Sequence, residues 1–283
     1  MDWVEGLNQS VRYIEEHLTD EIDSGQLGRI ACCSTYHYQR MFTYMAGISL
    51  AEYIRRRKMS LAAVELQDGK KRIIDVAAKY GYSSPTAFNR AFQSFHGIAP
   101  SSLKNTDALV KSFSPIAFYI TVKGATEMNY RIETKGAFRI IGVSAPLDRE
   151  MEKNFMVVPK LWQDDAADGT IQKLAGRMDA PPIGLLGVSA CNDEEQWKYF
   201  IAVSSTKENG EFEEYIIPAS TWAIFSATGD NQSVQELERR IITEWLPGSG
   251  YEYADAPDIE VYLNPDPQNA QYEVWIPVVR KGE

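Results

Sequence analysis

The chain of 283 residues is long enough for about two domains, each with a core of its own. Its 44% hydrophobic and 24% charged residues are typical of a soluble globular protein, and no apolar run approaches the roughly 20 residues of a membrane span. The first 111 residues carry 14 Lys and Arg against 12 Asp and Glu, a balance of +2, whereas the remainder carries 15 against 27, a balance of −12, and would repel a polyanion.

The first predicted element is a helix from Trp3 to Leu18, in which apolar residues recur at helical spacing. This segment is acidic and lacks the basic and then apolar order of a secretory signal, so the cytoplasm is the expected location. The three cysteines are odd in number and lack metal-site spacing. They predict neither a disulfide framework nor a metal site, and no cofactor is expected.

The next segment predicts a helix, a tight turn and a second helix. Leu27 and Ile30 lie on the apolar side of the first helix, and Ser34 caps the second, which runs from about Thr35 to Ala46. The free face of the second helix holds Tyr36, His37, Gln39, Arg40 and Thr43.

A long helix from Ser49 to Gln67 is predicted next, because apolar residues recur along one stripe. It carries four consecutive basic residues, 55–58. Such a run is more often a solvated face than a binding patch, although its position between two helix-turn-helix patterns favours contact with phosphate groups.

The helix, turn and helix pattern recurs between Ile74 and Pro100. Gly81 supplies a turn where φ can be positive, Ser84 caps the second helix and Pro85 opens it. An apolar stripe of Phe88, Phe92 and Phe95 leaves a polar face that holds Thr86, Ala87, Asn89, Arg90 and Gln93. Two such units in tandem predict sequence-specific binding to double-stranded DNA.

Both units resemble the AraC family of transcription regulators, with matches over nearly all of residues 1–105. The matching residues of the second unit are Gly81, Tyr82, Ser84, Phe88, Arg90, Phe92, Phe95, Gly97 and Pro100. Those of the first unit are Ser34, His37, Gln39, Arg40, Phe42, Gly47, Tyr53, Ile54, Arg57, Ser60 and Ala62. The resemblance implies that one monomer reads two successive major grooves with the second helix of each unit.

Carried over by position, the resemblance implies base contacts by Tyr36, Gln39 and Arg40 from the first reading helix, and by Thr86, Asn89 and Arg90 from the second. The chemistry suits these roles, because arginine can bond a guanine edge bidentately, and Gln or Asn an adenine edge. For Arg40 and Arg90 the alternative is a phosphate contact or a salt bridge to a neighbouring helix.

After the helical domain, residues 1–109, periodicity weakens and a linker is predicted over residues 110–127. Residues 128–283 then show short strands and two helices, near 155–167 and 233–244, in the order of two strands, a helix and two strands, twice over. The expected fold is multidomain: an all-α tandem helix-turn-helix domain, followed by an α+β domain with antiparallel sheets, an internal duplication and helices on one side.

A candidate ligand site lies in the predicted strand near Asp258 to Leu263, where alternation puts Glu260 and Tyr262 on one face. Such a carboxylate is either solvent-exposed or buried at a cost, and a bound cation that stacks on aromatic rings would offset that cost. Five tryptophans in this half could line a pocket or fill a core: Trp162, Trp197, Trp222, Trp245 and Trp275. Trp222 is the first choice for a pocket wall.

Four segments of the second half, 217–229, 244–253, 257–264 and 275–278, resemble the GyrI-like effector-binding domain of multidrug-responsive regulators. The resemblance implies a pocket with aromatic walls, in which a glutamate at the position of Glu260 meets cationic aromatic ligands. Some stand-alone members of this group resemble hydrolases that use a glutamate and aromatic residues in the same cavity.

Together these patterns predict a ligand-responsive transcription regulator, with activation of efflux or detoxification genes as the expected output, and not an enzyme. Its expected partners are double-stranded DNA and a small lipophilic or cationic effector, with RNA polymerase as a further candidate and no membrane. Two alternatives stay open for the second half: a protein-interaction module without a small ligand, and a hydrolase of reactive small molecules.

Overall fold

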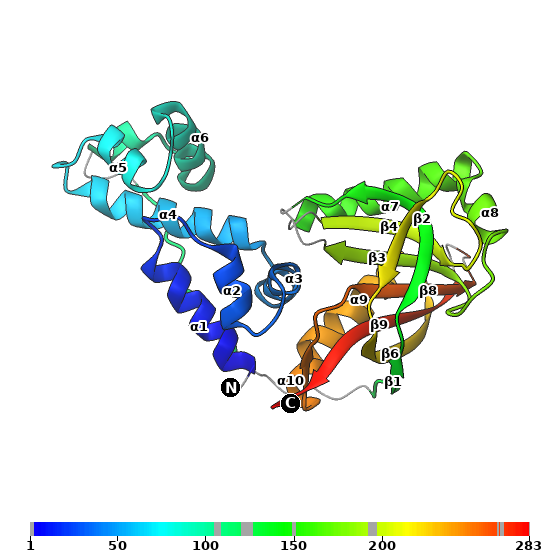
Figure 1. Cartoon of the computed structure of the whole chain (residues 1–283). Helices are drawn as coiled ribbons and strands as arrows, with labels where there is room; N and C mark the ends of the chain where they lie inside the picture. The colour runs from blue at the N-terminus through cyan, green and yellow to red at the C-terminus, as the bar shows by residue number, and fades with distance from the viewer. Residues whose placement is uncertain are drawn as a thin grey trace.

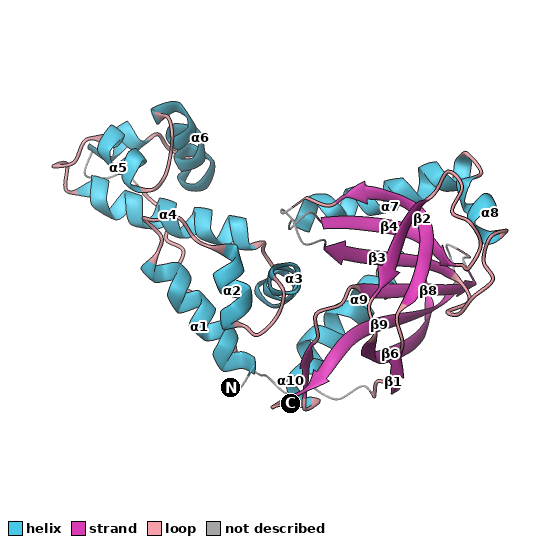
Figure 2. Cartoon of the chain, in the orientation of Figure 1, coloured by secondary structure: helices cyan, strands magenta, loops and turns pink. Residues whose placement is uncertain are grey.

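The computed structural model describes residues 3–104, 109–119, 127–148, 151–191, 197–264, 266 and 269–282. A helical domain and a sheet domain lie side by side (Figures 1 and 2). Residues 120–126 of the predicted linker lie outside the described residues. Within the described ranges, no helix combines the length and the apolar character that crossing a bilayer requires.

The helical domain consists of α1 (Trp3–Glu16), α2 (Ser24–Ile30), α3 (Thr35–Ala46), α4 (Leu50–Gln67), α5 (Ile73–Lys79), α6 (Pro85–His96) and a 3-10 turn, η1 (Pro100–Lys104). The predicted caps are confirmed: the Ser34 hydroxyl accepts a hydrogen bond from the His37 amide, and the Ser84 hydroxyl accepts one from the Ala87 amide. Gly47 ends α3 in the left-handed conformation, with φ of 68°.

Helix α4 supports both helix-turn-helix units. Its first turns, with Leu50 and Tyr53, join the core that holds Phe42 of α3, whereas Met59 joins the core that holds Phe88 of α6. The basic run 55–58 is paired within the domain. Arg55 and Arg56 form ion pairs with Glu52, Arg57 forms one with Glu15 (Nη2 to Oε2 2.6 Å), and the Lys58 ammonium donates to the Tyr80 carbonyl.

The sheet domain begins with β1 (Tyr130–Lys135), β2 (Phe138–Pro146), α7 (Met151–Ala167), α8 (Thr170–Ala175), β3 (Leu185–Cys191) and β4 (Trp197–Ser204). It continues with β5 (Glu213–Ile217), β6 (Ser220–Gly229), α9 (Asn231–Arg240), the π-helical turn η2 (Ile241–Trp245), α10 (Leu246–Gly248), β7 (Tyr251–Tyr253), β8 (Asp258–Asn264) and β9 (Ala270–Arg280). This order contains the predicted succession of strands and helices. The predicted helix 233–244 is divided into α9 and η2, and α8, α10 and β7 are additions.

The nine strands of the described residues form one antiparallel sheet in the order β1-β6-β9-β8-β3-β4-β2-β5, with β7 paired to β9. The antiparallel α+β fold expected for this half is thus confirmed. Strand β1 pairs with β6, and β5 pairs with β2, so each half of the domain lends its first strand to the other. That the two halves are a duplication stays a prediction.

Strand alternation divides the sheet into two faces. Residues such as Tyr199 and Ile201 pack with α7 and α8, whereas their neighbour Phe200 lies in a cluster on the opposite face. The same alternation along β8 sends Ile259 and Val261 to the opposite face and leaves Glu260 and Tyr262 on the side of the helices. The predicted orientation of Glu260 and Tyr262 is confirmed.

Candidate functional site

A cavity of about 110 Å³ lies where α3 of the helical domain meets α7, α9 and the sheet. The sheet domain supplies Trp162 from α7, Tyr199 from β4, Glu238 from α9, and Glu260 with Tyr262 from β8. Leu147, Asn154, Val158, Pro159, Ser189, Val234 and Gln235 complete this part of the lining. The walls are therefore mainly aromatic and aliphatic, with two carboxylates among them.

Glu260 is held by the hydroxyl groups of two tyrosines. Its Oε2 accepts hydrogen bonds from the Tyr262 hydroxyl at 2.8 Å and from the Tyr199 hydroxyl at 3.0 Å. The Trp162 indole donates to the Tyr199 oxygen at 3.0 Å, which orients that hydroxyl toward Glu260. Burial, followed by the charge of Glu238, raises the pKa of Glu260 to about 7.

Gly187 of β3 makes room for this arrangement. It lies opposite Glu260 in the β3–β8 pairing. A Cβ atom at position 187 would overlap the Tyr199 hydroxyl and would lie 2.7 Å from Oε2 of Glu260. A glycine in the interior of a strand often marks close approach by other groups, so Gly187 is a signal that could have pointed to this site, although the prediction from the sequence did not use it.

Trp222 lies elsewhere, and its prediction as a pocket wall is corrected. The residue is fully buried in the cluster on the opposite face of the sheet, where its ring centroid lies 6.0 Å from that of Trp275. Alternation along β6 turns Ala223 toward the helices and Trp222 away from them. Trp162 takes the role that was predicted for Trp222.

The remaining wall of the cavity comes from α3, which contributes Tyr36, Arg40 and Tyr44. The Arg40 guanidinium forms one ion pair with Glu238 of α9 and another with Asp258 of β8. The Tyr44 hydroxyl donates to Glu238 at 2.9 Å. Burial alone would lower the pKa of Arg40, but the charges of Glu238 and Asp258 outweigh it and raise that pKa above its ordinary value.

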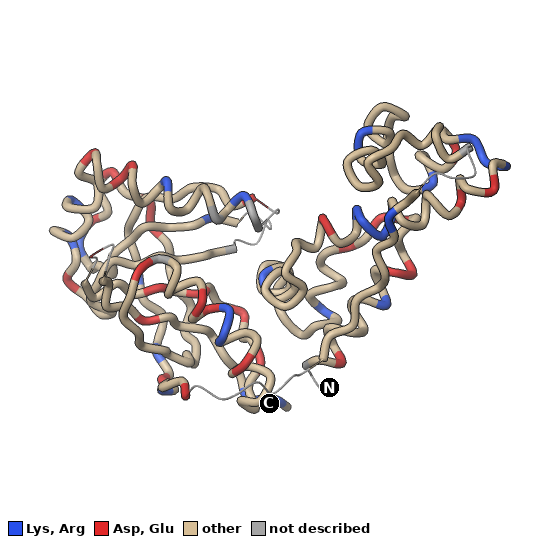
Figure 3. Tube along the Cα trace, turned by 180° about the vertical axis from the view of Figure 1, so that it is seen from behind, with Lys and Arg blue, Asp and Glu red and all other residues tan. Residues whose placement is uncertain are grey.

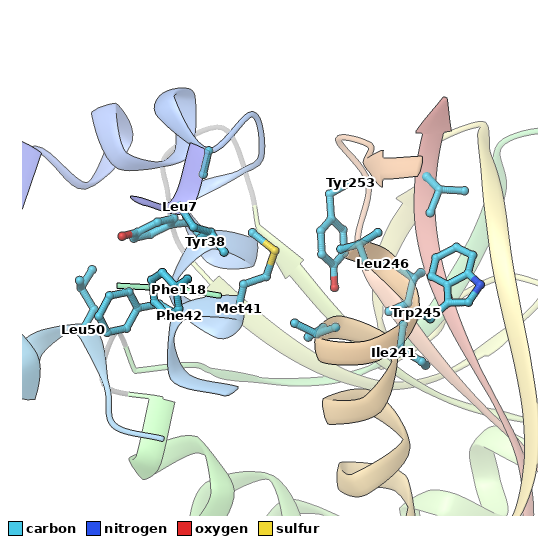
Figure 4. Packing of buried hydrophobic residues seen from close by; sticks show 14 of the residues in the cluster. Leu7, Tyr38, Met41, Phe42, Leu50, Phe118, Ile241, Trp245, Leu246 and Tyr253 are labelled. Atoms are coloured by element: carbon cyan, nitrogen blue, oxygen red, sulfur yellow. The ribbon is translucent and has the colours of Figure 1, made fainter. Parts of the chain in front are cut away.

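Aromatic contacts extend this interface between α3 and the sheet domain, which we call the seat of α3. The Tyr36 ring meets the Trp197 ring edge-on at 5.2 Å between centroids, and the His37 ring stacks on Tyr253 at 4.0 Å. Met41 lies between the core of the helical domain and the residues of η2, in one cluster with both (Figure 4).

This seat covers the face of α3 for which base contacts were predicted. Tyr36, Gln39 and Arg40 are 7%, 6% and 4% exposed. For Arg40, the alternative to a base contact was a salt bridge. In this conformation Arg40 does form salt bridges, with two buried carboxylates of the second domain. In this conformation these three residues are not available to DNA.

Helix α6, the other helix for which base contacts are predicted, presents an exposed polar face. Thr86, Asn89 and Arg90 of α6 are exposed, as are their neighbours Ala87 and Gln93. Helix α6 lies at the end of the helical domain that points away from the sheet domain (Figure 1). Lys and Arg residues on this end alternate with some Asp and Glu residues, and Asp and Glu residues are frequent on the sheet domain (Figure 3).

Comparison with known proteins assigns a family to each half. The GyrI-like small-molecule-binding domain matches residues 128–279, and a helix-turn-helix domain matches residues 27–106. The transcriptional activator AarP of Providencia stuartii is 34% identical over 101 residues, which are 36% of this chain and 75% of AarP. The regulatory protein SoxS of Salmonella typhimurium is 33% identical over 95 residues, which are 34% of this chain and 89% of SoxS.

Among solved structures, SAV2435 bound to tetraphenylphosphonium matches 54% of this chain and 94% of its own. The sequence identity is 20% and the TM-score is 0.45.

Proposed function

Because this chain belongs to the family of GyrI-like small-molecule-binding proteins, and joins that domain to an AraC-type helix-turn-helix domain, we propose that it regulates transcription in response to a lipophilic organic cation. The cation binds in the cavity at Glu260 and stacks on the rings of Trp162, Tyr199 and Tyr262.

One observation carries the choice of a cation. Glu260 faces an aromatic cavity, and among the described residues no lysine or arginine forms an ion pair with it. A carboxylate in such a place is costly when ionised. A permanent cation with aromatic groups would supply the missing charge and the stacking surface at once.

DNA binding belongs to the helical domain. Thr86, Asn89 and Arg90 of α6 form an exposed polar face that suits base contacts in one major groove. The second groove is read by Tyr36, Gln39 and Arg40 when α3 is free of the sheet domain. The protein works in the cytoplasm, and it activates transcription, as AarP does, with RNA polymerase as its partner at the promoter.

The sheet domain senses its ligand without transforming it. The cavity lining in the described residues contains two glutamates and several tyrosines but no histidine or cysteine, so it offers no Ser–His or Cys–His pair of nucleophile and base. After prolonged incubation with the full chain, mass spectrometry should detect the probe, tetraphenylphosphonium, unchanged. Conversion of the probe at a rate that Glu260→Gln abolishes would show a hydrolase instead.

A fluorescence titration of the full chain tests the cation site. Tetraphenylphosphonium, a permanent cation, should quench tryptophan emission saturably because Trp162 lies in the wall, and triphenylphosphine oxide, a neutral relative, should bind more weakly. Glu260→Gln should weaken the binding of the cation by about tenfold, equivalent to about 1.4 kcal/mol.

Glu211→Gln is the matched control, because Glu211 is exposed and pairs with Lys173. It should bind the cation as the natural chain does. Equal cation affinity in the Glu260→Gln and Glu211→Gln variants would contradict the assignment of Glu260.

A further inference from the structure

Two tasks of the molecule meet on the same face of α3. A helix that enters the major groove must present its side chains to base edges. In this conformation Tyr36 and Arg40 instead face Trp197, Glu238 and Asp258 of the sheet domain. The seated helix and the DNA-bound helix therefore exclude each other.

The same two side chains close the ligand cavity. Tyr36 and Arg40 form its α3 wall together with Tyr44, and the opposite walls belong to the sheet domain. Arg40 brings a cation to Glu238, one of the two carboxylates of the lining. The internal guanidinium thus occupies the kind of position that an external cation would take.

The cavity left beside the seated helix is small. Its volume of about 110 Å³ is below the roughly 300–1,000 Å³ of pockets that enclose drug-sized ligands. The walls on β4 and β8 are fixed by the ladder of a continuous sheet. The wall on α3 belongs to another domain, so it can withdraw without breaking that sheet.

We propose that α3 is a built-in competitor of the effector: Arg40 and Tyr36 fill part of the cation site while the DNA-reading face is covered, and a bound cation displaces them and frees α3 for DNA. This inference rests on the proposed function and adds its regulation. The cation and DNA both bind best to the state in which α3 has left the sheet domain. Each therefore raises the affinity for the other by the same factor.

Asp258→Asn tests the competition without touching the cavity. Asp258 holds Arg40 but is absent from the cavity lining, so the substitution weakens the seat of α3 and leaves the proposed cation contacts in place. Asp255→Asn is the matched control, because it removes the same charge from an exposed position in the segment that precedes β8. Both variants are compared as full chains.

The expected results concern two affinities. Asp258→Asn should bind tetraphenylphosphonium more tightly than the natural chain and the Asp255→Asn variant. Without the cation, it should also bind more tightly to a duplex enriched by the natural chain from a random-sequence pool. Saturating tetraphenylphosphonium should raise the affinity of the natural chain for that duplex by about 5- to 150-fold, the usual range of coupling between sites, and that of Asp258→Asn by less.

A second variant tests whether the effects of Asp258→Asn come from the release of α3 or from damage to the fold. Trp197→Leu removes the ring that Tyr36 contacts, changes no charge and lies outside the cavity lining. It should shift both affinities in the same direction as Asp258→Asn, with thermal unfolding showing that each variant is folded.

Two failures are distinguishable. If neither cation nor neutral probe binds to any of these chains, the proposed function as a cation sensor falls, and the competition falls with it. If the cation binds but its affinity is unchanged in Asp258→Asn and Trp197→Leu, or if it leaves the affinity for the duplex unchanged or lowers it, the competition alone is overturned.

Discussion

The pKa of Glu260 is raised first by burial and second by the charge of Glu238. Hydrogen bonds from Tyr262 and Tyr199 and the charge of Arg40 lower that pKa by less. A cation prefers the ionised carboxylate. The affinity for tetraphenylphosphonium should therefore fall as the pH drops below about 7, by up to about tenfold for each pH unit, and should level off above that value. Titrations between pH 5.5 and 8.5 would measure this, because the probe itself has no titratable group.

The Glu260→Gln variant is the control for this pH dependence. Its cation affinity should be low and flat over the same range, because the titrating group is gone. The unfolding free energy gives an independent check of sign. Since the pKa is raised from 4.5 to about 7, the folded chain keeps the proton longer than the unfolded chain, so stability should fall from pH 4.5 to 7 in the natural chain relative to Glu260→Gln. The opposite slope would contradict a raised pKa.

Arg90 and Asn89 are exposed on α6 and can reach a base edge without rearrangement of the domains. Arg90→Ala and Asn89→Ala should each weaken binding to the enriched duplex by about 1–3 kcal/mol and binding to random duplex much less. Base contacts discriminate between DNA sequences, whereas phosphate contacts do not. Fluorescence anisotropy at a fixed salt concentration measures both affinities.

Arg239→Ala serves as the control for the α6 variants, because Arg239 is an arginine of the sheet domain that pairs with Glu236. It should leave both duplex affinities unchanged. Equal losses on enriched and random duplex in Arg90→Ala would reduce Arg90 to a phosphate contact.

At the scale of elements, features set by local patterns could be predicted from the sequence. Ser34 and Ser84 cap their helices as expected, and the two-residue period near Glu260 fixes its face. Elements of a few residues, such as α8 and β7, carry too few periods to be recognised. Trp222 was misplaced because a tryptophan suits a core and a pocket equally well, and only the strand's pairing partners decide between them.

Gly187 of β3 leaves the space in which Tyr199 of β4 and Glu260 of β8 meet. Gly187→Ala should lower the unfolding free energy by about 1–3 kcal/mol, because the added methyl group overlaps the Tyr199 hydroxyl and crowds Glu260. It should also weaken the binding of tetraphenylphosphonium. Urea unfolding measures the first effect and fluorescence titration the second.

Gly136→Ala is the control for the substitution in β3, because a Cβ atom at position 136 would meet no atom within 4 Å. It should change neither the unfolding free energy nor the affinity for the cation appreciably. If Gly187→Ala were as stable as Gly136→Ala, Gly187 would not be what makes room for the carboxylate and the hydroxyl.

At the scale of the whole molecule, the seat of α3 could not be predicted from the sequence. Arg40 and Asp258 are separated by 218 positions, and their pairing depends on how two finished domains meet. Local patterns show only that Arg40 lies on a free face of its own unit. That face is suited to DNA and, for the same reasons of charge and exposure, to buried carboxylates of another domain.

The two arginines of the reading helices should therefore differ in their effects on the cation site. Arg40→Ala leaves Glu238 and Asp258 without their cation in the seated state, and loss of one partner of a buried ion pair costs about 3–5 kcal/mol. The seat should loosen, so the affinity for tetraphenylphosphonium should rise by about tenfold or more while the affinity for the enriched duplex falls. Arg90→Ala should lower only the affinity for the duplex, because α6 lies away from the cavity. Titration of both full-length variants with the cation, in the absence of DNA, measures the contrast, and equal cation affinities would show that Arg40 does not restrain the site.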